Sequence, residues 1–313
     1  MLKFMDNYPM KNLTTLKIGG PAKKFVKVTN PNELIEAINY AKQNNLEYLV
    51  IGGGSNLLVS DKGVDKLIIK NEILGIEHQG QNIKVKSGTV LQDLVHYSIS
   101  HGLLGIQKMT GIPGTVGGAV YGNAGAYGQT ISDNIISVVV LSDRRESKDL
   151  ITLNKDDCNF NYRDSGFKKN KYTILEVRFS LNTNNPTTLD QEAKDVLSKR
   201  LIKYPPGIKC PGSFFKNIVA ETLPKEILEK IPSEKITYGK ISAGYLLESV
   251  GANGQVLDGI EIAGYHANLF INKGGGSAQT FYTLAKKYSQ KVKEKFGITL
   301  EPEVQLINLP PIS

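Results

Sequence analysis

The chain has 313 residues, enough for two or three domains, and its 40% hydrophobic and 22% charged residues are ordinary for a soluble globular protein. No apolar run approaches the roughly 18 to 20 residues of a membrane span, and the first residues lack the apolar core of a signal peptide. Cys158 and Cys210 form neither a disulfide framework nor a zinc motif, so a cytoplasmic location and no bound metal are expected. The net charge of +8 suits an anionic ligand, but acidic residues are mixed with the basic ones, so neither nucleic acid nor a membrane is expected as a partner.

The first elements are a helix and a buried strand. Asn30 is a good N-cap in front of Pro31, and apolar residues follow at helical spacing. Tyr48–Ile51 is a short apolar run that predicts a strand. Three consecutive glycines, Gly52, Gly53 and Gly54, follow it directly. A glycine turn after a strand exposes backbone N–H groups that can hold a pyrophosphate, although a tight structural turn would show the same pattern.

This glycine turn matches neither common nucleotide motif. No Gly-Lys-Ser/Thr follows, which excludes a P-loop, and the third glycine of G-x-G-x-x-G falls on Leu57. Further on, residues 83–87 alternate as a strand, and Thr89 is expected to cap a helix that Gly102 stops.

Residues 111–128 read GIPGTVGGAVYGNAGAYG and contain the densest group of glycines in the chain. Glycine costs backbone entropy and packs no side chain, so such density favours close approach of the main chain to a flat or anionic group. Interleaved alanines, valines and tyrosines argue against a low-complexity linker. Two glycine-rich segments in one chain favour a large phosphate-bearing cofactor.

The second half of the chain predicts strands at 135–141 and 172–181, and then a polar run at 182–188 that indicates a domain boundary. The elements expected after this boundary are helices at 189–204, 242–250 and 278–296, the last ended by Gly297, and a final strand at 298–307. We therefore expect an α+β or α/β fold with domains at 1–188 and 189–313.

Three short motifs carry groups suited to chemistry: YRDS at 162–165, GSFFKN at 212–217 and LEPEV at 300–304. Taken singly, each is also typical of a surface ion pair, a turn or a solvent-facing strand. Together with the glycine-rich segments they resemble one family, UDP-N-acetylenolpyruvoylglucosamine reductase, over nearly the whole chain. The matching segments, in the order that the family has, also include TTLKIGGPA at 14–22, IGGGSNLL at 51–58 and HAN at 266–268.

The resemblance implies an FAD-binding domain of the vanillyl-alcohol-oxidase (PCMH) type followed by a smaller α+β substrate-binding domain. FAD would be held without a covalent bond, and NADPH would be the reductant. The residues implied in cofactor binding are Gly52, Gly53, Gly54, Ser55, Asn56, Leu57, Gly111, Ile112, Pro113, Gly114, Gly117, Gly118 and Ala119.

The resemblance also implies a reaction, in which the enolpyruvyl group of a UDP-sugar is reduced in peptidoglycan precursor synthesis. Arg163 and Glu303 would hold the substrate carboxylate, and Ser213 would give a proton to the carbanionic carbon. Glu303 is preferred to Glu301 because the family motif places the catalytic residue directly before Val-x-x-Ile. The resemblance further implies substrate contacts through Lys203 and Asn217, and we expect a monomer.

The chain departs from the family pattern in two places. Ile218 stands where proline is more usual, which alters a turn rather than a reactive group. The interval between Arg163 and Ser213 is short and resembles the subclass without an extra substrate-covering loop. Two other functions stay open at this point: a different flavoprotein of this fold, such as an oxidase of small alcohols, and a colourless nucleotide-sugar or nucleic-acid binding protein.

Overall fold

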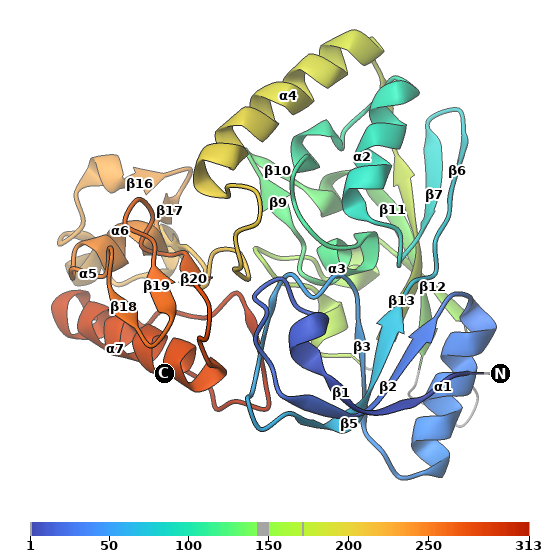
Figure 1. Cartoon of the computed structure of the whole chain (residues 1–313). Coiled ribbons are helices and arrows are strands. Elements are labelled where there is room, and N and C mark those ends of the chain that lie inside the picture. The colour runs from blue at the N-terminus through green and yellow to red at the C-terminus, as the bar shows by residue number, and fades with distance from the viewer. Residues whose placement is uncertain (1, 143–149, 171, 313) are drawn as a thin grey trace. The chain divides into compact units, whose positions relative to one another are not determined.

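The computed structural model describes residues 2–142, 150–170 and 172–312, and the chain divides into two compact units (Figure 1). Unit 1 consists of Met1–Tyr8, Lys23–Gly53 and Asp65–Tyr204, and unit 2 of Pro9–Ala22, Gly54–Val64 and Pro205–Ser313. The chain therefore leaves unit 1 at Tyr204, further along than the boundary expected at residue 188. The reason is helix α4 (Pro186–Lys203), whose Leu189 and Ala193 belong to the core of unit 1.

Unit 1 contains a four-stranded sheet, a five-stranded sheet and four α-helices among its described residues. Its strands are β1 (Met5–Pro9), β2 (Pro21–Val28), β3 (Tyr48–Ile51), β5 (Val64–Asn71), β6 (Ile76–Gln79), β7 (Asn82–Lys86), β8 (Leu103–Leu104), β9 (Gly125–Ala126), β10 (Gln129–Thr130), β11 (Ile135–Ser142), β12 (Leu150–Asn154), β13 (Tyr172–Ser180) and β14 (Asn182–Thr183). Besides α4, its helices are α1 (Pro31–Gln43), α2 (Leu91–Ser100) and α3 (Val116–Tyr121), with 3-10 turns at Gln107–Met109, Ile131–Asn134, Asp156–Cys158 and Gly166–Lys168.

The four-stranded sheet has the order β1-β2-β5-β3 and is covered by α1, whose Leu34 and Ile38 are fully buried with Leu67 of β5. The expected helix and strand are both confirmed. The side chain of Asn30 accepts the backbone N–H of Glu33 at 3.0 Å, as an N-cap does. Strand β3 runs parallel to β5 and ends at Ile51, which delivers the glycine turn to the edge of this sheet.

The five-stranded sheet is antiparallel, with the order β12-β11-β13-β7-β6, and shares a core with α2 and α3. The strands predicted at 83–87, 135–141 and 172–181 correspond to β7, β11 and β13. The cap predicted for α2 is wrong. Val90 is the N-cap residue, because the hydroxyl of Thr89 is occupied by Gly75, accepting its N–H at 3.1 Å and donating to its carbonyl at 3.2 Å.

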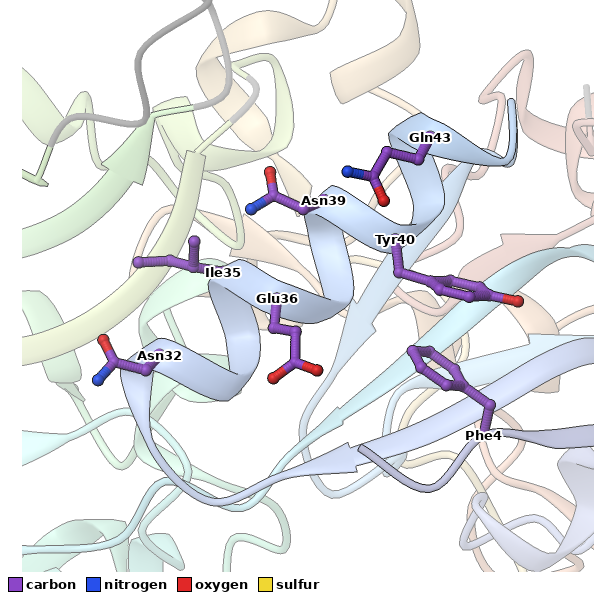
Figure 2. A pocket seen from close by; sticks show the side chains of 7 residues that line it. All are labelled: Phe4, Asn32, Ile35, Glu36, Asn39, Tyr40 and Gln43. Atoms are coloured by element: carbon purple, nitrogen blue, oxygen red, sulfur yellow. The ribbon is translucent and has the colours of Figure 1, made fainter. Parts of the chain in front are cut away.

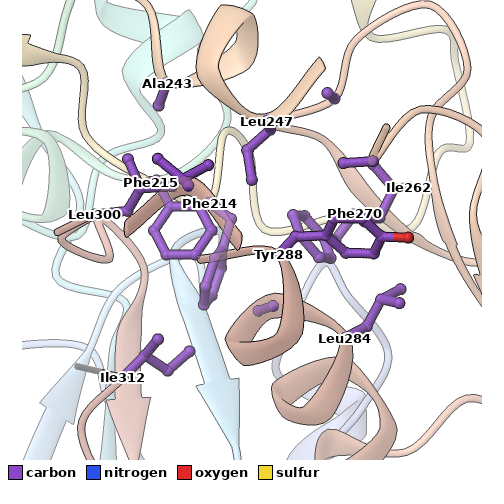
Figure 3. Close-up of a cluster of buried hydrophobic side chains, with 14 of the residues drawn as sticks. Phe214, Phe215, Ala243, Leu247, Ile262, Phe270, Leu284, Tyr288, Leu300 and Ile312 are labelled. Carbon is purple, nitrogen blue, oxygen red and sulfur yellow. The ribbon is translucent and has the colours of Figure 1, made fainter. Parts of the chain in front are cut away.

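Unit 2 is built around the long helix α7 (Ala278–Phe296) and a cluster of phenylalanines (Figure 3). Its other elements are β4 (Leu57–Val59), β15 (Ile218–Val219), α5 (Lys225–Leu228), β16 (Ile236–Thr237), β17 (Lys240–Ile241), α6 (Ala243–Glu248), β18 (Val256–Leu257), β19 (Ile260–Ile262), β20 (Phe270–Asn272) and β21 (Gln305–Ile307), with 3-10 turns at Met10–Asn12, Ala220–Thr222 and Ser233–Lys235. The predicted limits of α7 are confirmed, with Gly297 in the left-handed conformation at φ 77°.

The final strand predicted at 298–307 is largely wrong. Only Gln305–Ile307 forms a strand, β21, which pairs in parallel with β4. The preceding residues are held differently: Leu300 and Val304 are buried in the unit 2 core, and Pro302 makes an isolated bridge with Phe215. Proline cannot donate a ladder hydrogen bond, so a continuous strand through residue 302 is disfavoured.

Candidate active site

The two glycine-rich segments meet within unit 1. A Cβ atom on Gly53 would lie 2.6 Å from the Cα of Gly114, and one on Gly52 would lie 2.2 Å from the hydroxyl oxygen of Thr115. Backbones this close leave no room for a side chain on residue 53, which explains physically why glycine stands there. The amine of Lys70 on β5 donates to the carbonyl of Gly52, and burial lowers the pKa of that amine.

Glycine is required for different reasons at different positions of the second segment. Gly114 has φ 117° and Gly111 has φ 75°, values that favour glycine. Gly117 instead lies against Ser87, whose Cβ would be 2.8 Å from an added Cβ, so close packing beside β7 explains it. Gly118 is exposed and Ala119 is buried on α3. The second segment therefore owes its glycines partly to backbone conformation and partly to close packing.

The second half of the first glycine segment belongs to unit 2. Gly54 has φ 65°, and its carbonyl accepts the N–H of Thr15 at 3.1 Å. The side-chain amide of Asn56 donates to the carbonyl of Glu303 at 3.1 Å, and the Asn56 carbonyl accepts the N–H of Gln305 at 3.0 Å. Asn56, predicted to contact the cofactor, is thus also a backbone partner of the segment that carries Glu303.

Arg163 is held in unit 1 by carbonyl groups of the glycine-rich segment. Its Nη2 donates to the Gly125 carbonyl at 2.6 Å and its Nη1 to the Asn123 carbonyl at 3.4 Å. Its backbone has φ 53°, a conformation that non-glycine residues seldom adopt. Lys168 donates to the Arg163 carbonyl at 2.7 Å and stabilises this turn. Such a conformation occurs often at functional sites, where surrounding contacts hold it in place.

Ser213 and Glu303 are brought together within unit 2. The N–H of Glu303 donates to the carbonyl of Phe214, the residue after Ser213, at 2.7 Å. Phe214 and Phe215 are fully buried beside Phe270 and Leu300 (Figure 3). The two phenylalanines anchor the backbone directly after Ser213, while Gly212 with φ 86° forms the turn before it.

The preference for Glu303 over Glu301 concerns two residues of different exposure, because Glu301 is exposed and Glu303 is partly buried. Glu301 has a side chain that is 71% exposed and forms an ion pair with Lys216 at 2.6 Å. This pairing directs Lys216 toward Glu301. The backbone contacts of Glu303, in contrast, are with Phe214 and Asn56.

The remaining predicted substrate contacts lie in different units. Lys203 is the last residue of α4 in unit 1, and its amine lies 5.2 Å from the ring centroid of Tyr204. Asn217 is in unit 2, where its side-chain oxygen accepts the N–H of Ala243, the first residue of α6, at 3.2 Å. Arg163 likewise belongs to unit 1, whereas Ser213 and Glu303 belong to unit 2.

One candidate, Arg200 on α4, was missed by sequence reasoning. Its Nη2 donates to the Gly111 carbonyl at 3.1 Å, while its Nε is buried without a hydrogen-bond partner. Burial lowers the pKa of its guanidinium, and Arg163 adds like-charge repulsion. In the described part of the chain no carboxylate contacts Arg200. A partly buried cation that no carboxylate contacts favours binding of an anion beside Gly111. In the sequence, Arg200 lies among other basic residues, and no motif distinguishes it from a cation on the protein surface.

A separate cavity of about 470 Å³ lies along α1 (Figure 2). It is lined by Asn32, Glu36 and Asn39 and by the stacked rings of Phe4 and Tyr40, whose centroids are 4.0 Å apart. None of the predicted cofactor or catalytic residues lines it.

Among the described residues, no cluster of three histidine, cysteine or acidic side chains is suited to a metal ion. No described helix combines the length and the apolar character needed to cross a bilayer.

Comparison with known proteins defines the class first. Residues 22–145 match the FAD binding domain family, and residues 205–307 match the family described as UDP-N-acetylenolpyruvoylglucosamine reductase, C-terminal domain. The chain is therefore a flavoprotein with a PCMH-type FAD-binding domain followed by a smaller C-terminal domain, which confirms the α+β fold class expected from the sequence.

Similar proteins of the whole chain's length identify the family. The UDP-N-acetylenolpyruvoylglucosamine reductase of Solibacter usitatus is 35% identical over 300 residues, covering 96% of this chain and 95% of that protein. The corresponding reductase 2 of Bacillus cereus is 34% identical and covers 95% of this chain and 90% of that protein. The crystal structure of the Thermus caldophilus reductase (MurB) matches with a TM-score of 0.75 at 27% identity, covering 98% of both chains. This chain belongs to the UDP-N-acetylenolpyruvoylglucosamine reductase family.

Proposed function

We propose that this protein uses NADPH and FAD to reduce the enolpyruvyl ether of UDP-N-acetylglucosamine to the lactyl ether, giving UDP-N-acetylmuramate for peptidoglycan precursors. Membership of the reductase family over nearly the whole chain is the observation that carries this function. Within unit 2, the backbone bond between Glu303 and Phe214 adds support, because it keeps the proposed proton donor Ser213 close to a proposed carboxylate contact.

The residues present fit FAD on two observations in unit 1. The bare backbones of Gly53 and Gly114 lie together, and the buried Nε of Arg200 has no partner. We assign pyrophosphate binding to residues 52–57 and flavin contact to residues 111–119, with no covalent attachment. FAD, when bound, accepts two electrons from NADPH and supplies hydride to the substrate. A glycine turn after a strand and the partly buried guanidinium of Arg200 are both suited to an anionic cofactor, which supports the proposal.

Replacement of Gly53 by alanine tests the flavin assignment. The added methyl would lie 2.6 Å from the Gly114 Cα, so the two segments must separate. Overpacking of this kind costs about 1–3 kcal/mol, so we expect FAD affinity to fall about tenfold or more. Titration of the apoprotein with FAD, followed by flavin fluorescence, measures the change. Gly264→Ala is the control, because an added Cβ there meets nothing within 4 Å. Equal FAD affinity in the two variants would contradict the assignment.

The proposed chemistry divides among three residues. When hydride reaches the methylene carbon, negative charge builds on the neighbouring carbon and spreads into the carboxylate. Arg163 supplies a planar cationic fork for that carboxylate, with Glu303 as a second contact. Ser213 donates its hydroxyl proton to the carbanionic carbon, completing the addition of one hydride and one proton across the double bond. We assign contacts with the rest of the nucleotide sugar to Lys203 and Asn217.

The proposed state of the protein is a cytoplasmic monomer. Both cysteines are free and buried, which suits a reducing compartment. Sedimentation of the FAD-loaded protein would test the oligomeric state, and a dimer peak at all concentrations would overturn that part.

The visible spectrum of the purified protein tests the function itself. Under anaerobic conditions, NADPH should bleach the flavin, and the enolpyruvyl UDP-sugar should restore its colour. Bleaching without recovery would indicate another flavoenzyme of this fold. A protein that takes up no FAD would favour the binding-protein alternative.

A further inference from the structure

The HAN motif, residues 266–268, has no assigned role in the reaction, yet its last residue makes three hydrogen bonds with the segment after Ser213. Asn268 is 2% exposed. Its Oδ1 accepts the N–H of Phe215 at 2.8 Å, and its Nδ2 donates to the carbonyl of the same residue at 2.8 Å. Its own carbonyl accepts the N–H of Phe214 at 2.9 Å.

These bonds make the side chain of Asn268 equivalent to a short piece of strand. An amide presents one acceptor and one donor side by side, and the backbone of Phe215 presents the complementary pair. Aspartate lacks the donor and leucine lacks both groups, so asparagine is the side chain of this size that satisfies both buried backbone groups. The bridge between Ser213 and Leu269 extends the same pairing to Ser213 itself.

The geometry points to Asn268 as a positioning residue for Ser213. Ser213 lies between two backbone segments of different character. Gly212 before it has the left-handed conformation of a turn, whereas the backbone of Phe215 after it is held by the side-chain amide of Asn268. Because Phe214 also accepts the N–H of Glu303, the segment fixed by Asn268 is the one on which Glu303 is aligned. This inference rests on the proposed function, because it gives Asn268 its effect through the proton that Ser213 donates.

The chain offers a closely matched control in Asn272, in strand β20. Asn272 is 6% exposed, its Nδ2 donates to the Leu16 carbonyl at 3.0 Å, and its Oδ1 accepts the N–H of Gly274 at 3.0 Å. Replacement by aspartate therefore removes one buried donor bond to a backbone carbonyl in either case. Only the replacement at residue 268 disturbs the segment after Ser213.

Anaerobic stopped-flow spectroscopy of the FAD-loaded variants tests the inference. Asn268→Asp should slow oxidation of the reduced flavin by the enolpyruvyl UDP-sugar about 10- to 100-fold, the effect of a small misplacement of a reacting group. Reduction of the flavin by NADPH should be unchanged, and Asn272→Asp should leave both steps unchanged while shifting the urea midpoint in the same direction. Equal slowing in the Asn268 and Asn272 variants would overturn the inference.

A double-mutant cycle separates positioning from a general loss of stability. If Asn268 acts through Ser213, Asn268→Asp should slow the substrate step by a smaller factor in the Ser213→Ala background than in the wild type. The same factor in both backgrounds would mean that Asn268 acts elsewhere.

Hydrogen exchange gives a readout that does not need the proposed reaction. Amides of residues 213–217 should exchange faster in Asn268→Asp than in Asn272→Asp, and equal exchange would overturn the inference. If the wild-type flavin is not reoxidised by the UDP-sugar, the proposed function fails, and exchange then decides the positioning of Ser213 independently.

Discussion

Replacement of Ser213 by alanine is expected to slow reduction of the enolpyruvyl substrate by about 10²–10⁴-fold, the range for loss of a general acid. An alcohol is a weak acid, so proton donation requires a strongly basic carbon held at short range. The removed hydroxyl is the only change, because Phe214 and Phe215 keep the backbone in place through burial and through Asn268. FAD content, NADPH oxidation by the bound flavin and substrate affinity should stay the same.

Single-turnover oxidation of the NADPH-reduced flavin by the UDP-sugar measures this effect without interference from the first half-reaction. Ser233→Ala is the matched control, since Ser233 is an exposed serine of the same unit. An unchanged rate in Ser213→Ala would mean that Ser213 is not the proton donor. Its role in the GSFFKN segment would then be structural.

Replacement of Arg163 by lysine is expected to lower kcat/KM for the UDP-sugar by about 10²-fold or more, as removal of one donor to a developing oxyanion does. The guanidinium already donates to the Gly125 and Asn123 carbonyls, and its planar shape lets it face a carboxylate at the same time. An ammonium is a point charge without this fork, so it cannot satisfy both directions.

Steady-state kinetics with varied UDP-sugar measure the loss, and flavin reduction by NADPH serves as the internal reference. Arg178→Lys provides the control, because Arg178 in β13 forms a partly exposed ion pair with Glu176 in the same unit. Turnover near the wild-type value in Arg163→Lys would indicate that Arg163 only supports the turn at φ 53°.

Local elements of the fold could be predicted from the sequence, because their signals act within a few residues. Asn30 caps α1 and Gly297 ends α7 through bonds and backbone conformations that neighbouring residues decide. Thr89 shows the limit of such signals. Its hydroxyl bonds to Gly75, a partner far away in sequence, and the cap expected from local pattern is lost.

For the candidate site, the sequence predicted residues but not the contacts between them. The meeting of Gly53 with Gly114 agrees with two segments expected at one cofactor, and the roles of Arg163, Ser213 and Glu303 stay predictions. The hydrogen bonds that connect the candidate site residues to their neighbours could not be predicted. Asn56 reaches Glu303, and Arg200 reaches Gly111, through contacts that only the folded chain creates. Neither residue type nor spacing marks such partners in advance.

The composition of unit 2 has a consequence for how the protein is synthesised. Leu16 and Leu58 leave the ribosome much earlier than their core partners Phe281 and Leu300 and the strand β21. The apolar side chains of Leu16 and Leu58 therefore stay uncovered until these later partners have been made, which is a period of exposure to aggregation. Conversely, a fragment that begins at Pro205 would contain α7 but lack β4, the strand with which β21 pairs. Unit 2 can assemble only after the residues of α7 and β21 have been made.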